Sequence, residues 1–167
     1  MSGPAPLDGL VEVRLVGLPL AVYRDSSEHH DELRREFALI AAGETSATTS
    51  VPARLVALID ALQVRFGTFT AQPTEALQRA LERGDDRIDL VYRVPPEAKE
   101  AAWELDALLD EADEFCRQGE HLLTLATPAP AAALRRWFLS EFAAQIDGAA
   151  PMSWDDWNRA GGSPTGH

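Results

Sequence analysis

The stretch RIDLVYRV, residues 87–94, decides the fold class because its apolar and charged side chains alternate. Period-two alternation is the pattern of a β-strand with one buried face and one more polar face. The apolar side of this strand comprises Ile88, Leu90, Tyr92 and Val94. A half-buried strand of this kind predicts a sheet that helices cover on one face.

Two other segments predict strands. Residues 11–16, VEVRLV, alternate in the same way, and the GLP that follows at 17–19 should break or bulge the strand. LAVY, residues 20–23, is consistent with its continuation. HLLTLA, residues 121–126, is the third predicted strand. We therefore expect a small mixed or antiparallel sheet of three to five strands.

The first predicted helix begins after Ser26 or Ser27 as its N-cap, with acidic residues in its first turn. Adjacent His29 and His30 then lie at the helix start, on different shoulders of an apolar stripe that contains Leu33. There the positive end of the helix dipole should hold both imidazoles neutral. Such histidines could be metal ligands, a catalytic pair, a pH sensor, or structural residues that also face a partner.

Four more helices are predicted, over residues 50–67, 73–84, 96–117 and 128–147. Ser50 and Thr127 are the predicted N-caps of the first and last of these, and Gly67 and Gly84 are predicted stop residues. The order of elements predicts an α+β fold, a two-layer sandwich with helices on one face of the sheet and a C-terminal helix.

The chain divides into three regions. Residues 1–8 are predicted to be a flexible N-terminus, 9–147 a single domain and 148–167 a tail. Within the tail, Ser153 is placed to cap a short docked helix around 153–158, and the end of the tail is predicted to be disordered.

Charge and composition limit the function classes. The net charge of −12 disfavours nucleic-acid binding, and the segment 97–117 carries eight acidic residues against Lys99 and Arg117, which suits a basic partner protein. Without a long apolar run or a signal peptide, we expect a cytoplasmic protein that does not bind membranes. The single Cys116 excludes an internal disulfide and, on an apolar stripe, predicts an inert core thiol.

No motif predicts catalysis or a cofactor. The chain has no Gly-x-Ser-x-Gly elbow, P-loop or Gly-x-Gly-x-x-Gly run. His29 and Glu32, three residues apart, could offer two metal ligands, but no second cluster supplies the rest of a zinc site. We therefore expect no catalytic residues, metal or cofactor.

Aromatic and basic residues predict an interaction surface instead. Trp103 lies almost opposite the apolar arc of its helix, so either another part of this chain or a partner should cover it. Trp154 and Trp157, one turn apart in the tail, are candidates for either role. Arg135 falls inside an apolar arc and is expected to snorkel outward or, less favoured, to pair with a carboxylate, whereas Arg136 and Glu141 are expected on the surface.

The segments SEHHDELRREFALIA (27–41), GEHLLTLATP (119–128) and LRRWFLSEF (134–142) together resemble an uncharacterised protein family of high-GC bacteria. The family's genes lie beside partner-switching regulators: ATP-binding anti-sigma kinases, STAS-domain antagonists and PP2C-type phosphatases. The resemblance covers about Val11 to Ile146 and implies a role in signalling, but no established chemistry.

A fainter resemblance is to the histidine-kinase-type ATPase fold. ARLVALIDALQVRFG (53–67) is similar to the helix that carries a metal-binding asparagine in those kinases, with Leu62 in its place. RIDLVYRVPPE (87–97) is similar to the strand before their Asp-x-Gly-x-Gly box, which is replaced here, and the Gly-rich lid is missing. The resemblance therefore implies a degenerate fold without ATP hydrolysis.

Three functions follow as hypotheses. The first is a non-enzymatic regulator that binds a protein partner, with a possible homodimer, through the predicted partner-binding residues Glu28, His29, His30, Glu32, Trp103, Arg135, Arg136, Trp154 and Trp157. The second is a small-ligand or nucleotide-binding sensor on a degenerate ATPase-like fold. The third is a metal-dependent enzyme that uses histidine and glutamate.

Overall fold

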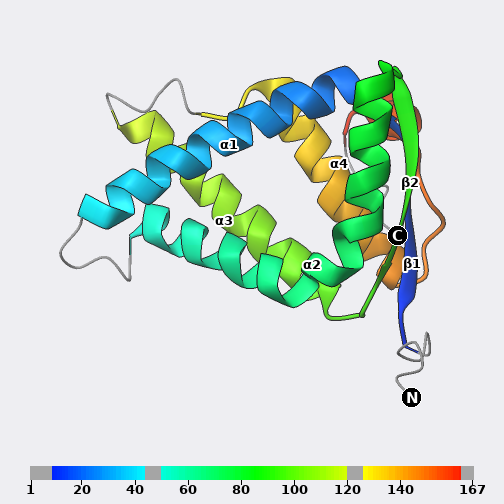
Figure 1. The fold of residues 1–167 in the computed structure, drawn as a ribbon, viewed down its shortest axis with the longest axis horizontal. Helices are drawn as coiled ribbons and strands as arrows, with labels where there is room; N and C mark the ends of the chain where they lie inside the picture. The colour runs from blue at the N-terminus through cyan, green and yellow to red at the C-terminus, as the bar shows by residue number, and fades with distance from the viewer. Residues whose placement is uncertain (1–8, 44–49, 120–125, 163–167) are drawn as a thin grey trace.

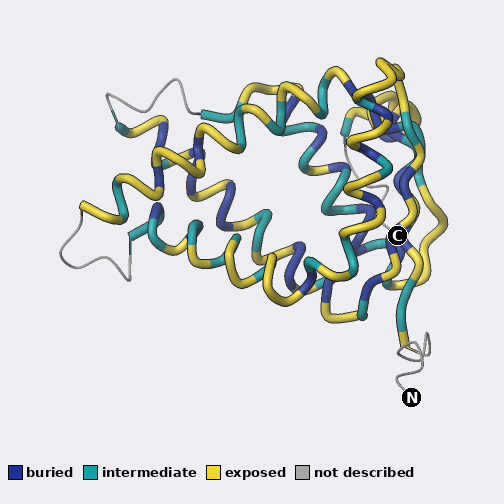
Figure 2. The backbone as a smooth tube through the Cα atoms, viewed as in Figure 1, coloured by how far each residue is buried: buried dark blue, intermediate teal, exposed yellow. Residues whose placement is uncertain are grey.

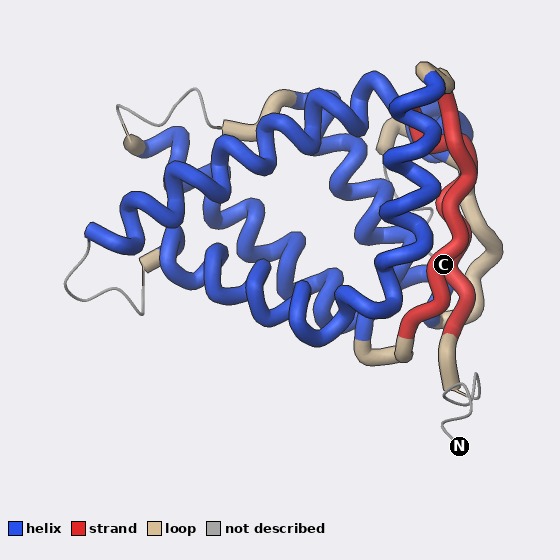
Figure 3. Tube along the Cα trace, in the orientation of Figure 1, coloured by secondary structure: helices blue, strands red, loops and turns tan. Residues whose placement is uncertain are grey.

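The computed structural model describes residues 9–43, 50–119 and 126–162. In chain order its elements are β1 (Val11–Pro19), α1 (Leu20–Gly43), α2 (Val51–Arg83), β2 (Arg87–Val94), α3 (Ala98–Gln118), α4 (Ala129–Ile146) and α5 (Trp154–Arg159). The two strands lie along one end of the molecule, and α1 to α4 surround a central region (Figures 1 and 3). Within the described residues, no helix is long and apolar enough to cross a membrane.

The strands confirm the alternation that the sequence predicts. β1 and β2 pair antiparallel from Val11 opposite Val94, and the register shifts between Leu15 and Leu18 around Gly17, whose φ is 72°. Buried positions alternate in β2 (Leu90, Tyr92, Val94) and in β1 before the register shift (Val13, Leu15), whereas adjacent Leu18 and Pro19 after the shift are both buried. The α+β character is confirmed, but the sheet of the described residues has two strands, not three to five. Apart from Ala126, the predicted strand at 121–126 lies outside the described residues.

A side chain of α4 completes the edge of this narrow sheet. The amide of Gln145 accepts a hydrogen bond from the Arg14 N–H and donates one to the Arg14 carbonyl, both at 2.8 Å. It thereby occupies backbone groups that a third strand would otherwise pair. Gln145 also donates to Glu141, whose carboxylate accepts the Met152 N–H at 3.0 Å. This chain of bonds ties β1, α4 and the tail together.

We expect Gln145→Leu to lower the free energy of unfolding by about 2 kcal/mol, since two hydrogen bonds to β1 are lost at roughly 1 kcal/mol each. Urea denaturation measures this loss. Gln118→Leu is the matched control, because among the described residues the Gln118 side chain bonds to exposed Glu114 on its own helix. If both variants lost equal stability, the edge contact would have no special importance.

The start of α1 corrects the sequence prediction. The helix begins at Leu20, directly after β1, so residues 20–23 do not continue the strand and neither Ser26 nor Ser27 is the N-cap. The Leu20 N–H donates to the Asp86 carbonyl at 3.0 Å, a bond from a segment far along the chain. The two histidines therefore lie well inside the helix, and the dipole argument for their neutrality no longer applies.

The predicted second and third helices form one helix of 33 residues, because Gly67 and Pro73 lie inside α2. Pro73 cannot donate the helical hydrogen bond to the Phe69 carbonyl. Next to it, the Thr74 hydroxyl donates to the Thr70 carbonyl at 2.7 Å. α2 changes direction between its two halves (Figure 1). Gly and Pro are the usual causes of such a bend. Its first half packs near α1 and α3, and its second half near β2.

Other helix ends fit the sequence more closely. Ser50 caps α2, Gly84 ends it with a φ of 73°, and Ser153 caps α5, each as predicted. α3 and α4 lie within a few residues of their expected bounds. Thr127 is not the cap of α4, because Pro128 holds that position.

The buried side chains form two clusters, and exposed positions lie mostly on the outer sides of the elements (Figure 2). The sheet core joins the strands to the second half of α2, the start of α3, α4 and α5. The distal core joins α1, the first half of α2 and the second half of α3, through Leu33, Phe37, Leu55, Leu108, Leu109, Ala112 and Cys116. The two cores meet between α1, α2, α3 and α4.

Candidate functional site: an apolar pocket between two cores

A pocket of about 300 Å³ lies where the two cores meet. α1 contributes His30 and β2 contributes Val94. The other walls come from α2 (Ile59, Leu62, Gln63, Phe66, Gly67, Thr70), α3 (Ala98, Ala101, Ala102, Leu105) and α4 (Phe138, Leu139, Phe142). Most of these apolar residues belong to the sheet core or pack on it, whereas Ile59 and Leu105 pack on the distal core.

Small side chains on α3 keep this space open. Ala98, Ala101, Ala102 and Leu105 follow the i, i+3, i+4, i+7 spacing of one helix face. Three of the four are alanines, so α3 presents backbone and methyl groups where larger side chains would fill the space. On the α4 side, Phe138 and Phe142 stack with their ring centroids 5.5 Å apart. The result is an apolar pocket with one aromatic wall.

Three polar side chains line the pocket: His30, Gln63 and Thr70. The Thr70 hydroxyl donates to the Gly67 carbonyl at 3.1 Å. Gln63 is exposed, which places it at the rim. His30 is the one titratable side chain among the described lining residues. The arrangement therefore supports binding and offers no pair of groups for acid–base chemistry.

His30 is held in its neutral form mainly by burial, which lowers the pKa of its imidazole. Electrostatic interactions with His29 and Arg135 lower the pKa of His30 further, while those with Asp31 and Asp113 act in the opposite direction. His30 is therefore neutral because it is buried, and not because of the helix dipole that the sequence suggests.

The pKa of His30 predicts a pH dependence of stability. Because the folded pKa lies below the unfolded value of about 6.5, the unfolded chain binds more protons as the pH falls through that value. We expect the free energy of unfolding to fall between about pH 7.5 and pH 5.5, and to fall less in His30→Gln. Urea denaturation at both pH values measures this. Glu141, whose pKa burial raises, contributes in the opposite direction but is present in both proteins. If wild type and His30→Gln lost the same free energy of unfolding over this pH range, the pH dependence would not come from His30.

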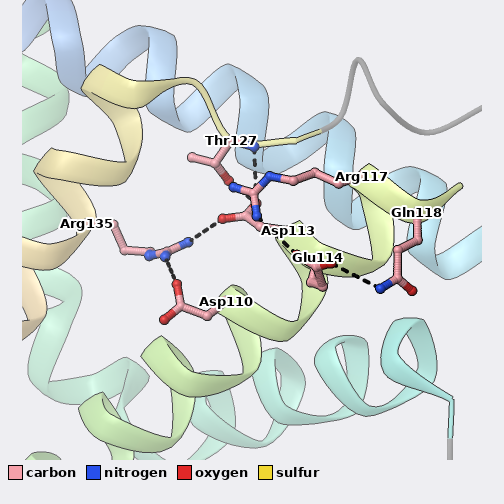
Figure 4. A network of polar contacts seen from close by, with 7 residues as sticks. All are labelled: Asp110, Asp113, Glu114, Arg117, Gln118, Thr127 and Arg135. Carbon is pink, nitrogen blue, oxygen red and sulfur yellow. Dashed lines mark hydrogen bonds and ion pairs between the residues drawn. The ribbon is translucent and has the colours of Figure 1, made fainter.

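Arg135 interacts with His30 of the pocket and lies in a network with aspartates of α3. Figure 4 shows two of them, Asp110 and Asp113. The structure overturns the prediction that Arg135 snorkels outward: its side chain is 10% exposed and pairs with Asp106, Asp110 and Asp113. Asp113, itself buried, also accepts hydrogen bonds from the Thr127 N–H and hydroxyl. The network joins α3 to α4: two guanidinium nitrogens donate hydrogen bonds to Asp110 and Asp113, and the Nε faces Asp106 at 3.4 Å without a hydrogen bond.

A second, smaller groove of about 250 Å³ brings Trp103 and Arg136 together with the edge of Trp157. Trp103 is 56% exposed, and the Lys99 ammonium lies 4.7 Å from the centre of its ring. The tail reaches this groove without covering Trp103. Arg136 is exposed, as the sequence predicts.

Trp154 and Trp157 lie in the sheet core at 8% and 2% exposure, so their side chains are not part of a free surface. Trp154 packs edge-on against Trp137 at 5.6 Å and stacks on Trp157 at 5.8 Å. The Trp137 indole donates to the Met152 carbonyl at 3.0 Å. These contacts dock the tail on the body of the protein.

The predicted residues of α1 divide between surface and interior. Glu28 and Glu32 are exposed, and Glu28 lines a separate groove beside Leu77 of α2. His29 is half-buried, with no hydrogen-bond partner for its Nε2 among the described residues. Only His30 enters the central pocket, so the structure does not unite the nine predicted residues in one site.

The described residues contain no group of three or more His, Cys, Asp or Glu side chains placed to hold a metal ion. Cys116 is fully buried, and burial raises the pKa of its thiol to about 11. An inert thiol is what its place on the apolar stripe predicts.

Sequence reasoning missed Asp113, Glu141 and Gln145, all of them buried. Glu141 was expected on the surface, but the Met152 N–H and Gln145 enclose it. Of these three residues, Asp113 alone has a signal in the sequence: its position beside the apolar arc of α3 indicates burial. The sequence contains one indication of the pocket, the three alanines Ala98, Ala101 and Ala102 on the apolar arc of α3.

Comparisons with models of known families, with curated proteins and with solved structures found no match for this chain.

Proposed function

We propose that this chain is a small-molecule sensor, a non-enzymatic protein that binds an apolar ligand in the central pocket. The observation that carries the proposal is the pocket of about 300 Å³ between four helices, with walls of alanine, leucine and phenylalanine. Ligand sites in proteins are typically mostly apolar, with a few polar groups that fix orientation. His30, Gln63 and Thr70 are such groups.

The position of the pocket supports a regulatory role. A ligand between Ile59 and Leu105 on one side and Phe66 and Phe142 on the other would contact both the sheet core and the distal core. Occupancy would therefore stabilise the packing of the two cores against each other. A ligand that binds one conformation better shifts the population toward it.

A titration with the uncharged fluorophore N-phenyl-1-naphthylamine tests this function. We expect saturable fluorescence enhancement and a rise in melting temperature. At a hundredfold excess over Kd, one bound ligand adds about 2.7 kcal/mol to the folded state. Heat-unfolded protein serves as the control for adsorption. If the folded protein gave neither saturation nor a thermal shift, the proposed function would be wrong.

A second candidate function, binding of a protein partner, has its own observation. Trp103 is 56% exposed beside Arg136, on a helix whose acidic face would steer a basic partner. The sequence resemblance makes this second proposal more specific. The chain would be a cytoplasmic regulator of the partner-switching class that binds such a basic partner.

Cross-linking and affinity capture with the neighbouring gene products test this candidate. We expect Trp103→Ala to lose the partner without loss of stability, because its side chain is largely exposed. Val64→Ala, a substitution of another exposed apolar residue on α2, should retain it. If wild type, Trp103→Ala and Val64→Ala all captured the partner equally, Trp103 would be excluded from the interface.

A further inference from the structure

The proposed pocket also carries information about its ligand, through its size, its charge and its polar groups. A cavity of about 150 Å³ in a protein core binds benzene. At about 300 Å³, the central pocket has room for a molecule about two rings in size. The walls include Phe66, Phe138 and Phe142, which favour a planar, aromatic ligand.

The pocket offers no counter-ion for a charged ligand. None of its lining residues in the described part of the chain is an arginine, lysine, aspartate or glutamate. The nearby guanidinium of Arg135 faces Asp106, Asp110 and Asp113 at 3.4, 2.5 and 3.3 Å. Three carboxylates therefore already surround its single positive charge, although its Nε makes no hydrogen bond. A carboxylate or phosphate in the pocket would lose hydration without gaining an ion pair. This disfavours nucleotides and other anions.

His30 supplies the one interior hydrogen-bonding group that is not already committed. No hydrogen bond joins its ring to another described residue, whereas Thr70 donates its hydroxyl proton to Gly67. Burial lowers the pKa of His30, so the ring is a neutral imidazole with one donor and one acceptor nitrogen. A neutral imidazole matches a hydroxyl or a carbonyl of a ligand.

From these observations we infer that the pocket selects an uncharged, aromatic molecule of about two rings that carries a single hydroxyl or carbonyl group, and that this group bonds to His30. The inference rests on the proposed ligand-binding function and specifies its ligand class. His30 is then the residue that distinguishes a polar-tipped aromatic molecule from a plain hydrocarbon.

Three matched compounds test this selectivity: 2-naphthol, naphthalene and 2-naphthoate. Each is titrated at neutral pH, where 2-naphthol is uncharged, against protein loaded with N-phenyl-1-naphthylamine. The two-ring naphthalene part of this fluorophore matches the pocket, and its phenyl ring would extend through the open rim at Gln63. We expect 2-naphthol to displace the fluorophore at about a 3- to 10-fold lower concentration than naphthalene, the range of one hydrogen bond. We expect 2-naphthoate to be at least about tenfold weaker than 2-naphthol.

Variants then assign the selectivity. His30→Leu should bind naphthalene as well as or better than wild type does and lose the preference for 2-naphthol, while His30→Gln should keep part of it. His29→Leu is the matched control, because the adjacent histidine does not line the pocket, and it should keep the full preference. Circular dichroism checks that each variant is folded.

The outcomes separate the two claims. If the fluorophore and all three compounds fail to bind, the proposed function fails and this inference fails with it. If the compounds bind but 2-naphthoate is tightest, or if His30→Leu keeps the 2-naphthol preference, the pocket binds ligands but the inference about their class is wrong.

Discussion

Ala102→Leu should abolish ligand binding while the protein stays folded. Ala102 is 7% exposed and lines the pocket from α3, opposite the aromatic wall of α4. The larger side chain would occupy space that a two-ring ligand needs. We expect affinity for N-phenyl-1-naphthylamine to fall at least about tenfold, a change of 1.4 kcal/mol or more. Filling an existing cavity should leave stability unchanged or raise it by about 0.5–2 kcal/mol.

The matched control is Ala107→Leu, the same substitution at an exposed position of the same helix. It should bind the fluorophore as wild type does. Ala101→Leu provides a second test of the same wall if Ala102→Leu is strained. Undiminished binding in both folded pocket variants would place the ligand elsewhere.

Arg135→Ala should cause the largest loss of stability, about 3 kcal/mol, because it leaves buried Asp113 without its positive partner. Asp106 and Asp110 are more exposed and should contribute less, since solvent screens their charges. Arg136→Ala is the matched control, because this neighbouring side chain is exposed. It should change stability by less than about 0.5 kcal/mol. Urea denaturation measures both variants.

A double variant distinguishes charge pairing from lost packing. In Arg135→Met with Asp113→Asn, the asparagine oxygen can still accept the hydrogen bonds of Thr127, and the buried carboxylate charge is removed. Asp106 and Asp110 keep their charges, which solvent screens. We expect the double variant to be more stable than Arg135→Met alone, which is a coupling between neighbours. Additive losses would show that packing of the arginine stem, and not its charge, stabilises the contact between α3 and α4.

The periodic parts of the fold could be predicted from the sequence. The alternation in 87–94 predicts β2 because side-chain direction in a strand is set locally. The caps at Ser50 and Ser153 also depend on near neighbours and lie where the sequence indicates. Local patterns therefore establish the type of most elements.

Errors arose where a distant segment decides a local outcome. Ser26 was a reasonable cap by its neighbours, but α1 begins at Leu20, where the Asp86 carbonyl accepts the first N–H. Pro73 is typical of a helix start, yet α2 continues through it while both halves of the helix pack on other elements. Propensity is a weak prior that tertiary contacts override.

The candidate site was only partly visible in the sequence. The sequence predicts that His30 lies on a surface at the start of a helix, whereas the structure places it in a pocket wall. Arg135 was recognised as unusual, but its aspartate partners lie on another helix. A pocket depends on what faces the alanines of α3, and that information is not contained in the pattern of α3 alone.

Intermolecular nuclear Overhauser effects test the central claim most directly, in a sample with bound 2-naphthol and labelled alanine methyl groups. The pocket predicts contacts from the ligand protons to the methyl groups of Ala98, Ala101 and Ala102, and none to exposed Ala107. Contacts to Ala107 without any to these three alanines, or no contacts at saturating 2-naphthol, would contradict a ligand site between the two cores.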